Sequence, residues 1–283
     1  MQERRLLRIV YNEYFKKQLM KFLQSKKALA IPVTYLILFV SLVAIISITY
    51  SFAVVKVSSR GGLLKVSVAK QNMQVLNDAV RSVAWSFGAS EIVYMDDCGG
   101  VFQTKSTVKS LVINFADDVV FNSSIGKAFY ELESSEFTYD DLFIMGDYGA
   151  IINQSAYTMT QLYFSTGGNA KELTLCYRPS VTATPIGTSN GKLLNLIRVY
   201  IINLNSSQNL MLREKFYLKV TSLNVTTTTQ QYDFSASISS LALKAVFGGI
   251  LSTVWLPISS NSEGAVVNLE IVMCNVKIQR VEV

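Results

Sequence analysis

The pattern of hydrophobic positions divides the chain into an apolar run, a helical repeat and a region of strand-like alternation. The apolar run covers residues 28–55 and holds no charge between Lys27 and Lys56. As a continuous helix it would be about 42 Å long, more than the ~30 Å hydrocarbon core of a bilayer requires. Secretory signals that are cleaved have shorter apolar cores, of ~7–15 residues. The run therefore predicts a transmembrane helix, which we assign to residues 28–57.

A hinge and an amphipathic helix are predicted over residues 58–90. The sequence Ser-Ser-Arg-Gly-Gly at 58–62 predicts a break, because paired glycines are costly inside a helix. Apolar residues then recur at steps of three and four, which predicts a helix that packs on the protein's own sheet and ends at Gly88. Its apolar seam is Val66, Ala69, Met73, Leu76, Val80, Val83 and Phe87. Its predicted outward side chains are Lys70, Gln71, Gln74, Asn77, Asp78 and Arg81.

From about residue 91 the hydrophobic period changes to two, which is typical of β-strands. The predicted strands are 107–115, 157–164, 172–177, 193–204, 214–225, 231–238 and 266–281. Residues 196–202 are apolar on both faces apart from Arg198, which indicates a central strand. The last strand changes its apolar face near Cys274, which predicts a bulge there. We therefore expect a membrane-anchored α+β protein whose residues 91–283 form a mainly antiparallel β-sandwich or rolled sheet.

Two other segments have weaker patterns. The apolar run at 241–256 contains Lys244 and a Gly-Gly pair, and it is shorter than the ~20 residues that a membrane crossing needs. It is interpreted as a short helix or turn that leads into a core strand. The threonine- and glutamine-rich run at 225–231 is interpreted as a strand end with an exposed loop.

The positive charge of the chain is concentrated before the apolar run. Residues 1–27 contain eight Lys/Arg and two Glu, which accounts for the whole net charge of +6. By the positive-inside rule, this basic leader lies in the cytoplasm and residues 58–283 lie outside. Residues 28–283 carry 18 basic and 18 acidic side chains and no net charge, so we expect no nucleic-acid partner. The leader itself is compatible with an interfacial helix or with a solvated tail.

The amino-acid composition excludes several kinds of catalytic site and metal site. The chain has no histidine, which excludes a Ser-His-Asp or Cys-His set and a His-ligated zinc. The acidic pairs Asp96-Asp97, Asp117-Asp118 and Asp140-Asp141 offer oxygen ligands for calcium or carboxylates for a glycosidase. Their spacing fits neither an EF-hand nor an acid and nucleophile pair, and solvated turns explain them more simply. We therefore expect no catalytic residue, metal ion or cofactor.

Modification sites are suggested by cysteines and sequons. An outer location permits disulfides, and Cys98, in a turn-like segment, and Cys176, on the less apolar side of its strand, form the expected pair. Cys274 has apolar neighbours and is expected to stay a thiol; three reduced thiols are the alternative. Asn-X-Ser/Thr sequons begin at Asn122, Asn153, Asn205 and Asn224 and are compatible with N-glycosylation.

The boundary between leader and span resembles a known signal. Lys26-Lys27-Ala28-Leu29, a basic pair and a small residue before a hydrophobic helix, resembles the class III signal of archaeal type IV pilins. This resemblance implies cleavage between Ala28 and Leu29 by a membrane peptidase. It also implies that the retained helices bundle as a filament core beneath β-rich outer domains. The implied function is a non-enzymatic, pilin-like or minor-pilin subunit of the cell surface.

A second interpretation is a permanently anchored binding ectodomain, a receptor or accessory subunit that keeps its basic leader. In both cases the lipid bilayer is a partner, and self-association or contact with related subunits through the apolar helix is expected. Ser41, Thr49 and Ser51 are small or hydroxylated residues that allow close helix contact in lipid. Processing of the leader distinguishes the two interpretations.

Overall fold

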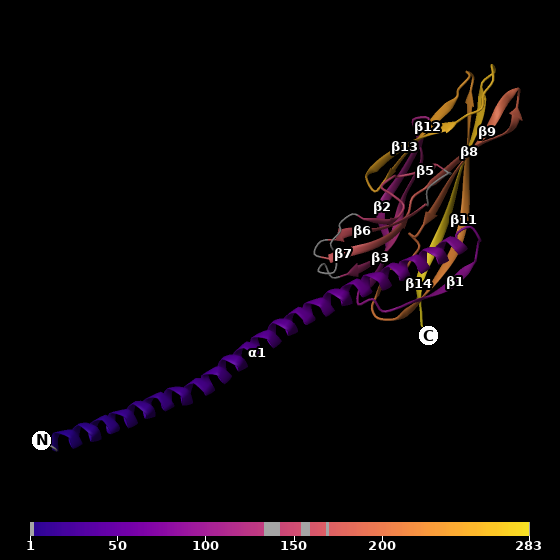
Figure 1. Ribbon diagram of the computed structural model, residues 1–283. Helices are drawn as coiled ribbons and strands as arrows, with labels where there is room; N and C mark the ends of the chain where they lie inside the picture. Colours follow the sequence, from indigo (N-terminus) through magenta and orange to yellow (C-terminus); the bar gives the residue numbers. More distant parts are fainter. Residues whose placement is uncertain (1–2, 133–141, 154–158, 168–169, 283) are drawn as a thin grey trace. The chain divides into compact units, whose positions relative to one another are not determined.

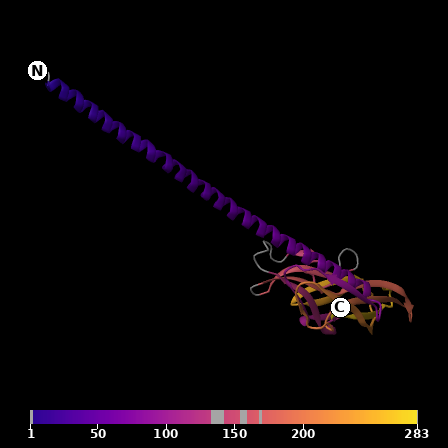
Figure 2. The same cartoon turned by 90° about the horizontal axis from the view of Figure 1, so that it is seen from below.

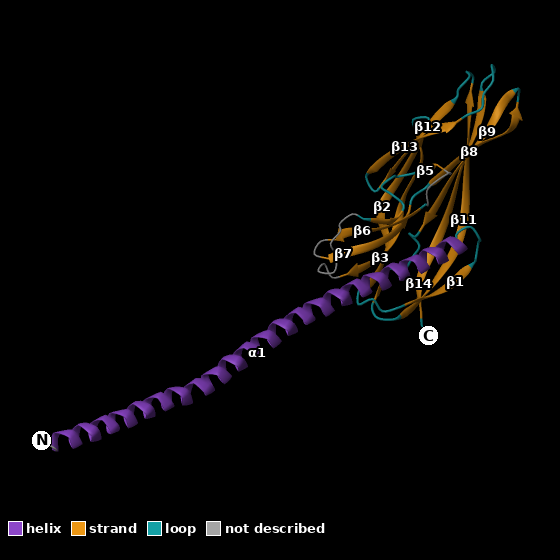
Figure 3. Ribbon diagram, viewed as in Figure 1, coloured by secondary structure: helices purple, strands orange, loops and turns teal. Residues whose placement is uncertain are grey.

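A computed structural model of the chain describes residues 3–132, 142–153, 159–167 and 170–282 (Figure 1). The described part consists of one long helix followed by short and long strands (Figure 3). Two compact units are present, one of residues 1–60 and the other of residues 61–283. The described residues of the first unit are all helical, and the second unit contains the end of the same helix and every described strand.

Helix α1 (Glu3–Val83) is uninterrupted through residues 58–62, so the predicted break is wrong. A glycine costs a helix interior only about 1 kcal/mol. Burial of the seam that follows outweighs that cost. The predicted seam is confirmed from Val66 to Val83, but Phe87 lies beyond the helix and is 78% exposed. Asn77, predicted to face outward, is buried. The helix ends five residues before Gly88, whose N–H donates to the carbonyl of Ser222.

The first sheet of the described chain is six-stranded and has the order β1-β11-β14-β9-β8-β5. Its strands are β1 (Ser90–Met95), β11 (Phe216–Phe234), β14 (Ala265–Val281), β9 (Lys192–Asn203), β8 (Ser180–Ser189) and β5 (Ile152–Asn153). Pairing is antiparallel except between β14 and β9 and between β5 and β8. The central strand predicted around Arg198 is confirmed, because β9 lies between β14 and β8.

The second sheet, again within the described residues, has eight strands and is antiparallel throughout. Its order is β13 (Ile250–Pro257), β12 (Ser240–Phe247), β2 (Val101–Phe115), β3 (Asp118–Leu132), β7 (Ala170–Tyr177), β6 (Thr160–Gly167) and β4 (Phe143–Met145), and β10 (Met211–Leu212) pairs with β2. A long N-terminal helix followed by two mostly antiparallel sheets confirms the α+β class.

Buried apolar residues of the described chain gather in two cores. The helix core joins the seam of α1, including Met73 and Leu76, to residues of both sheets such as Tyr130 and Leu218. Figure 2 shows the last turns of α1 lying against the strands. The inter-sheet core joins both sheets without α1, for example through β2, β9, β12 and β14. The helix end is therefore a structural part of the β-rich unit.

Strand β14 serves both cores with opposite faces. Val267, Leu269 and Ile271 are in the inter-sheet core, whereas Cys274 and Val276 are in the helix core. The predicted change of face is confirmed, but the bulge predicted at Cys274 is wrong. β14 keeps a continuous register with β9, and the irregularity lies in β11, between Ser222 and Asn224. Successive side chains of a strand point to opposite faces. The first part of β14 therefore turns one face to the inter-sheet core, and its last part turns the other face to the helix core.

Other predictions for the β region also need correction. The run at 241–256 forms the antiparallel hairpin β12–β13, whose turn contains Gly248 and Gly249, both with positive φ. The run at 225–231, predicted as a strand end with an exposed loop, is strand throughout. It belongs to the single strand β11, which also contains the first half of the strand predicted at 231–238. β3 and β8 were not predicted, because polar residues and glycine interrupt the apolar alternation of β3 and both Pro185 and Gly187 lie within β8.

Candidate membrane-spanning helix and polar sites of the β-rich unit

The apolar part of α1 has the properties of a membrane-spanning segment. Within the described residues one helical stretch is long and apolar enough to cross a bilayer; it begins at Pro32, and its most apolar window is wholly exposed. Tyr35, Phe39 and Ile48 are 64–71% exposed in the isolated chain. Large apolar side chains around the whole helix circumference suit a lipid environment.

Hydroxyl groups in this stretch bond to the helix backbone. Ser41 Oγ donates to the carbonyl of Leu38 at 2.9 Å, and Thr49 Oγ1 donates to that of Ile45 at 2.8 Å. Backbone-bonded hydroxyls carry no unsatisfied donor into hydrocarbon. The small residues Ser41, Thr49 and Ser51 all lie in α1, and their predicted role in helix association stays a prediction.

The candidate processing site lies inside the same helix. α1 begins at Glu3, so residues 3–27 of the basic leader, Ala28 and Leu29 are all helical in backbone conformation. Pro32 also lies within α1, four residues after Ala28. Proline has no N–H, and in a helix it removes the hydrogen bond to the carbonyl of residue i−4. The carbonyl that loses its helical donor is that of Ala28, which belongs to the candidate scissile bond.

Two asparagines connect the last turns of α1 to the strands. Asn72 Nδ2 donates to the carbonyl of Asp96 at 2.8 Å and to the hydroxyl of Tyr130 at 3.0 Å. The backbone N–H of Asp96 donates back to Asn72 Oδ1 at 3.2 Å. Burial raises the pKa of Tyr130, so the phenol stays protonated over the physiological range. Asn72 thereby fixes the segment that follows β1.

Asn77 forms the second connection, to the sheet that contains β6 and β7. Its Oδ1 accepts hydrogen bonds from Thr160 Oγ1 at 2.7 Å and from the hydroxyl of Tyr177 at 3.1 Å. Burial raises the pKa of Tyr177 well above the usual value. The spacing in the sequence could have identified both asparagines as buried, because Asn72 lies three residues after Ala69 and Asn77 lies four after Met73. These positions are within the buried stripe.

A buried cation is the third polar feature. Arg178, at the end of β7, has a fully buried side chain and forms an ion pair with Asp147. Arg178 Nη2 donates to Asp147 Oδ2 at 3.1 Å, and Nη1 donates to the carbonyl of Gly149 at 3.1 Å. The hydrogen bond from Arg178 holds the pKa of Asp147 below its usual value. The sequence showed no sign of this pair, because its members are 31 residues apart.

Cys176 lies in a mixed polar and aromatic environment. Lys109 Nζ is 3.8 Å from Cys176 Sγ, and the sulfur donates to Gln161 Oε1 at 3.5 Å. The same ammonium lies 5.1 Å from the ring centre of Tyr163 and 4.8 Å from that of Phe247. Burial raises the pKa of the Cys176 thiol despite the nearby lysine. A buried, protonated thiol is typical of a packed interior and not of a nucleophile.

The predicted disulfide is absent from the structure. Each of the three cysteines, all within the described residues, is a buried thiol. Cys98, expected in an accessible turn, belongs to the helix core, whereas Cys176 belongs to the inter-sheet core. The two sulfurs face different interiors, so the predicted pair is wrong. Cys274, predicted as a buried thiol, is buried beside the hydroxyl of Ser222.

Two of the three acidic pairs lie in the described part of the chain, and members of both contact nearby groups. Asp97 Oδ1 accepts the N–H of Gly99, and Lys215 Nζ lies 3.7 Å from Asp96 Oδ1. Asp117 has a φ of 68° in the turn from β2 to β3, and Lys244 approaches it at 3.6 Å. Asp140 and Asp141 lie outside the described residues. Among the residues that are described, no three His, Cys, Asp or Glu side chains gather as a metal site.

The sequon asparagines are dispersed over the β-rich unit. Asn122, Asn153 and Asn224 are exposed, and Asn205 is half-buried. In chain order, the four asparagines lie on β3, on β5, after β9 and on β11. Residues 154 and 155 of the second sequon lie outside the described part of the chain. Exposure at three sites is compatible with glycosylation, which stays a prediction.

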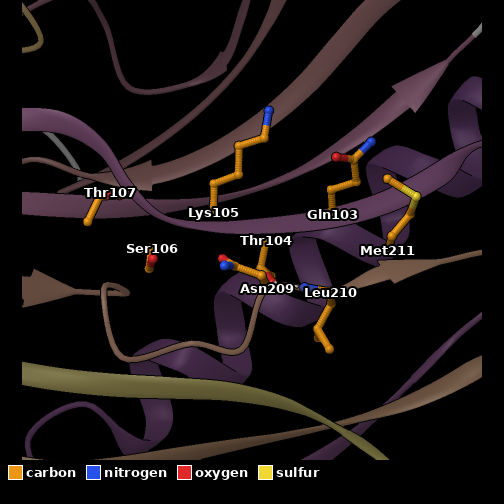
Figure 4. Close-up of a pocket in the computed structure, with 8 residues that line it drawn as sticks. All are labelled: Gln103, Thr104, Lys105, Ser106, Thr107, Asn209, Leu210 and Met211. Carbon is orange, nitrogen blue, oxygen red and sulfur yellow. Dashed lines mark hydrogen bonds between the residues drawn. The ribbon is translucent and has the colours of Figure 1, made fainter.

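A pocket of about 390 Å³ lies beside β2 (Figure 4). It occupies the stretch between the pairing of β2 with β10 and its pairing with β12. Thr104 points toward Asn209 and Leu210, and its hydroxyl accepts the N–H of Leu210 at 3.0 Å. The lining consists of Gln103, Thr104, Lys105, Ser106, Thr107, Asn209, Leu210 and Met211. These residues supply no carboxylate or thiol, so the pocket offers hydrogen bonds and one cation but no acid–base pair.

Comparison of the chain with protein-family models, curated proteins and solved structures yielded no match. The class of protein is therefore defined by architecture alone. It is an α+β protein with a long apolar N-terminal helix, one candidate membrane-spanning stretch among the described residues and a β-rich unit.

Proposed function

We propose that this chain is a single-pass, membrane-anchored subunit of the cell surface with a pilin-like design. The observation that carries the proposal is the exposed apolar surface of α1 over residues 32–57, which the described chain leaves uncovered. Lipid or neighbouring helices are the environments that suit such a surface. The β-rich unit has cores of its own and is the part available to the surroundings.

The proposed orientation follows from charge. The eight basic residues of the leader favour a cytoplasmic N-terminus. The unit of residues 61–283 then lies outside the membrane. Its near-neutral charge balance gives no electrostatic basis for nucleic-acid binding. The proposed partners are the bilayer and copies of this chain or related subunits, which meet through the apolar helix.

The proposed role is structural and non-enzymatic. The buried polar groups of the β-rich unit, around Asn72, Asn77 and Arg178, bond to one another or to the backbone. The pocket beside β2 lacks an acid–base pair. These features support a role in presentation and assembly.

Pro32 supports processing between Ala28 and Leu29. Backbone hydrogen bonds must open before a helical peptide bond can enter a peptidase, and Pro32 removes the bond that would hold the Ala28 carbonyl. The helix is therefore weakened at the bond that the pilin-like signal designates. Cleavage there removes the basic leader and leaves the span on the mature subunit.

The test is the mass of the native N-terminus, measured on chain extracted from its own membrane. We expect a mature chain that begins at Leu29. A variant with Lys26 and Lys27 replaced by glutamine should keep the leader, because the basic pair is part of the signal. Retention of residues 1–27 in the parent chain contradicts the pilin-like proposal.

One observation favours the alternative, a permanently anchored binding ectodomain. α1 is continuous from Glu3 through the apolar stretch, so leader and span form one helix. A retained cytoplasmic helix suits an accessory subunit of a membrane complex. An intact N-terminus, together with purification in a stable complex with other membrane proteins, supports this alternative.

A further inference from the structure

Strand β11 is longer than its neighbour β1, and the difference leaves part of the first sheet without a partner strand (Figure 1). β1 pairs with β11 as far as Thr221, and the backbone of Ser222 bonds to Gly88 and Ala89. β14 continues to pair with the opposite edge of β11 to its end. Beyond Ser222, no strand of the described chain pairs with this side of β11. Residues 224–234 on this side are named the open edge.

The composition of the open edge favours strand pairing. Residues 224–232 carry no charge and no proline, and four consecutive threonines begin at Thr226. Every residue from Thr226 to Gln231 is exposed. β-branched residues favour extended backbone, and an unpaired edge presents a row of N–H and C=O groups that another strand can bind.

Other edges of the two sheets have features that oppose pairing. β8 contains Pro185 and an irregular register between Pro185 and Gly187. β13 lies beside β8, and its Ser252 hydroxyl accepts the N–H of Ala150. β1 is short and exposes the charged Glu91. Prolines, bulges, charges and covering segments are the usual means by which proteins block edges. The open edge of β11 has none of these over residues 224–232.

We propose that the open edge pairs with the open edge of a second copy of this chain. The two strands are antiparallel about a two-fold axis through Thr228. Opposed residues in an antiparallel pair point to the same face of the sheet. A two-fold axis perpendicular to the sheet therefore places a residue opposite itself at the centre. Thr228 then opposes Thr228 of the second copy, and Thr226 opposes Gln230 of that copy.

A second copy fits this edge chemically. In the register centred on Thr228, all opposed pairs from Asn224 to Tyr232 are uncharged. Threonine pairs across strands are stabilising, whereas opposed like charges are destabilising. A register centred one residue later would oppose Asp233 to Val225 and is less favourable. Asp233 instead remains beyond the paired strands, where Lys192 forms its ion pair.

Pairing of this kind is isologous, so it closes as a dimer and joins two six-stranded sheets into one. It uses only residues of the β-rich unit. The inference is therefore independent of leader cleavage and of contacts through the apolar helix, and it goes beyond the proposed function. Membrane anchoring of both copies would raise their effective concentration.

The test is oxidative crosslinking, in native membranes, of full-chain variants that each carry one added cysteine. Thr228→Cys should form a disulfide-linked dimer, because centrally opposed Cα atoms lie within the range that a disulfide spans. Thr226→Cys alone should not, because residue 226 opposes residue 230 of the second copy. Thr226→Cys mixed with Gln230→Cys should crosslink again.

Two controls accompany the crosslinking. The parent chain should not crosslink, because its three cysteines are buried. Thr188→Cys places a thiol at an exposed position on β8, whose edge contains Pro185, and should not crosslink. Tryptophan fluorescence identical to that of the parent chain verifies that each variant is folded.

The register pattern decides the result. Absence of dimer from folded Thr228→Cys overturns the proposal. Equal crosslinking at residues 226, 228 and 188 also overturns it, because that pattern indicates random collision or association through α1. If the Thr228→Cys variant forms its disulfide with a different protein, the assignment of a second copy as the occupant is overturned.

Discussion

Thr160, on β6, donates a 2.7 Å hydrogen bond to the side-chain oxygen of Asn77, on α1. Both side chains are buried in the β-rich unit, and the hydroxyl of Tyr177 donates to the same oxygen. A satisfied polar group inside an apolar core fixes how its elements fit together, because any other arrangement leaves a buried donor or acceptor unpaired. The contact thus specifies the rotation of the last turns of α1 against the sheet.

Replacing Thr160 with valine should destabilise the β-rich unit. The substitution removes one hydrogen bond to the buried Asn77 oxygen, and we expect the free energy of unfolding to fall by about 1–2 kcal/mol. The measurement is denaturant unfolding of the full chain in detergent. Trp85 and Trp255 report on it, since both tryptophans of the chain lie in the β-rich unit.

Thr174→Val is the matched control for that change. Thr174 is as buried as Thr160, but its hydroxyl has no hydrogen-bond partner among the described residues. Valine has a similar shape, so stability should change by less than about 0.5 kcal/mol or increase. An equal loss in both variants would show that the contact with Asn77 is not responsible.

Asp147→Asn should weaken the chain in a pH-dependent way. The folded pKa of Asp147 is lowered by Arg178, so the interaction stabilises the fold above the unfolded pKa and is lost as pH falls through the folded pKa. Since Asp147 is half-exposed, we expect a loss of only about 2 kcal/mol at pH 7. The unfolding curves of parent and variant should converge as pH falls through the lowered folded pKa of Asp147. A difference in stability that stays the same from pH 7 into strong acid contradicts the ion pair.

Pro32→Ala should reduce cleavage between Ala28 and Leu29. Alanine restores the helical hydrogen bond to the Ala28 carbonyl and stabilises this part of the helix by up to about 3 kcal/mol. The fraction of chain that keeps its leader, measured by mass spectrometry, should rise. Val33→Ala serves as the control, because it retains Pro32. Equal processing of both variants would indicate that helix opening does not limit cleavage.

All three cysteines should resist a maleimide in the folded chain. Cys98, Cys176 and Cys274 are buried, and burial raises the pKa of the last two, which lowers their thiolate fraction. Denaturation without reductant should expose three reactive thiols. Labelling of a single cysteine under those conditions would indicate a disulfide that the structure does not contain.

Short-range patterns predicted the elements whose surroundings are uniform. The apolar run of α1 is uncharged and hydrophobic throughout its length, so its composition is sufficient to identify it. The seam from Val66 to Val83 has one apolar stripe and one core, and a period of 3.6 describes it. β9 is buried on one face and half-buried on the other, and its nearly continuous apolar run indicates such a central strand.

Elements that serve two environments were harder to predict. β14 turns opposite faces to the two cores, so its apolar positions change face along the strand. In the sequence, this change of face looks the same as one caused by a bulge. The threonine- and glutamine-rich half of β11 is interpreted from sequence as a strand end with an exposed loop, because its polar run has no apolar alternation. Its strand conformation comes from backbone pairing with β14, which no side-chain pattern records.

The amino-acid sequence alone determined the apolar span, the charge asymmetry around it, the helical seam and the change to β-structure, because each depends on residues that are neighbours along the chain. Only the tertiary structure decided the continuity of α1, the Asn77 and Arg178 contacts, the separate interiors of Cys98 and Cys176, and the open edge of β11. These features depend on residues far apart in sequence. Their stabilisation exists only after the sheets have brought the partners together, so no local pattern encodes it.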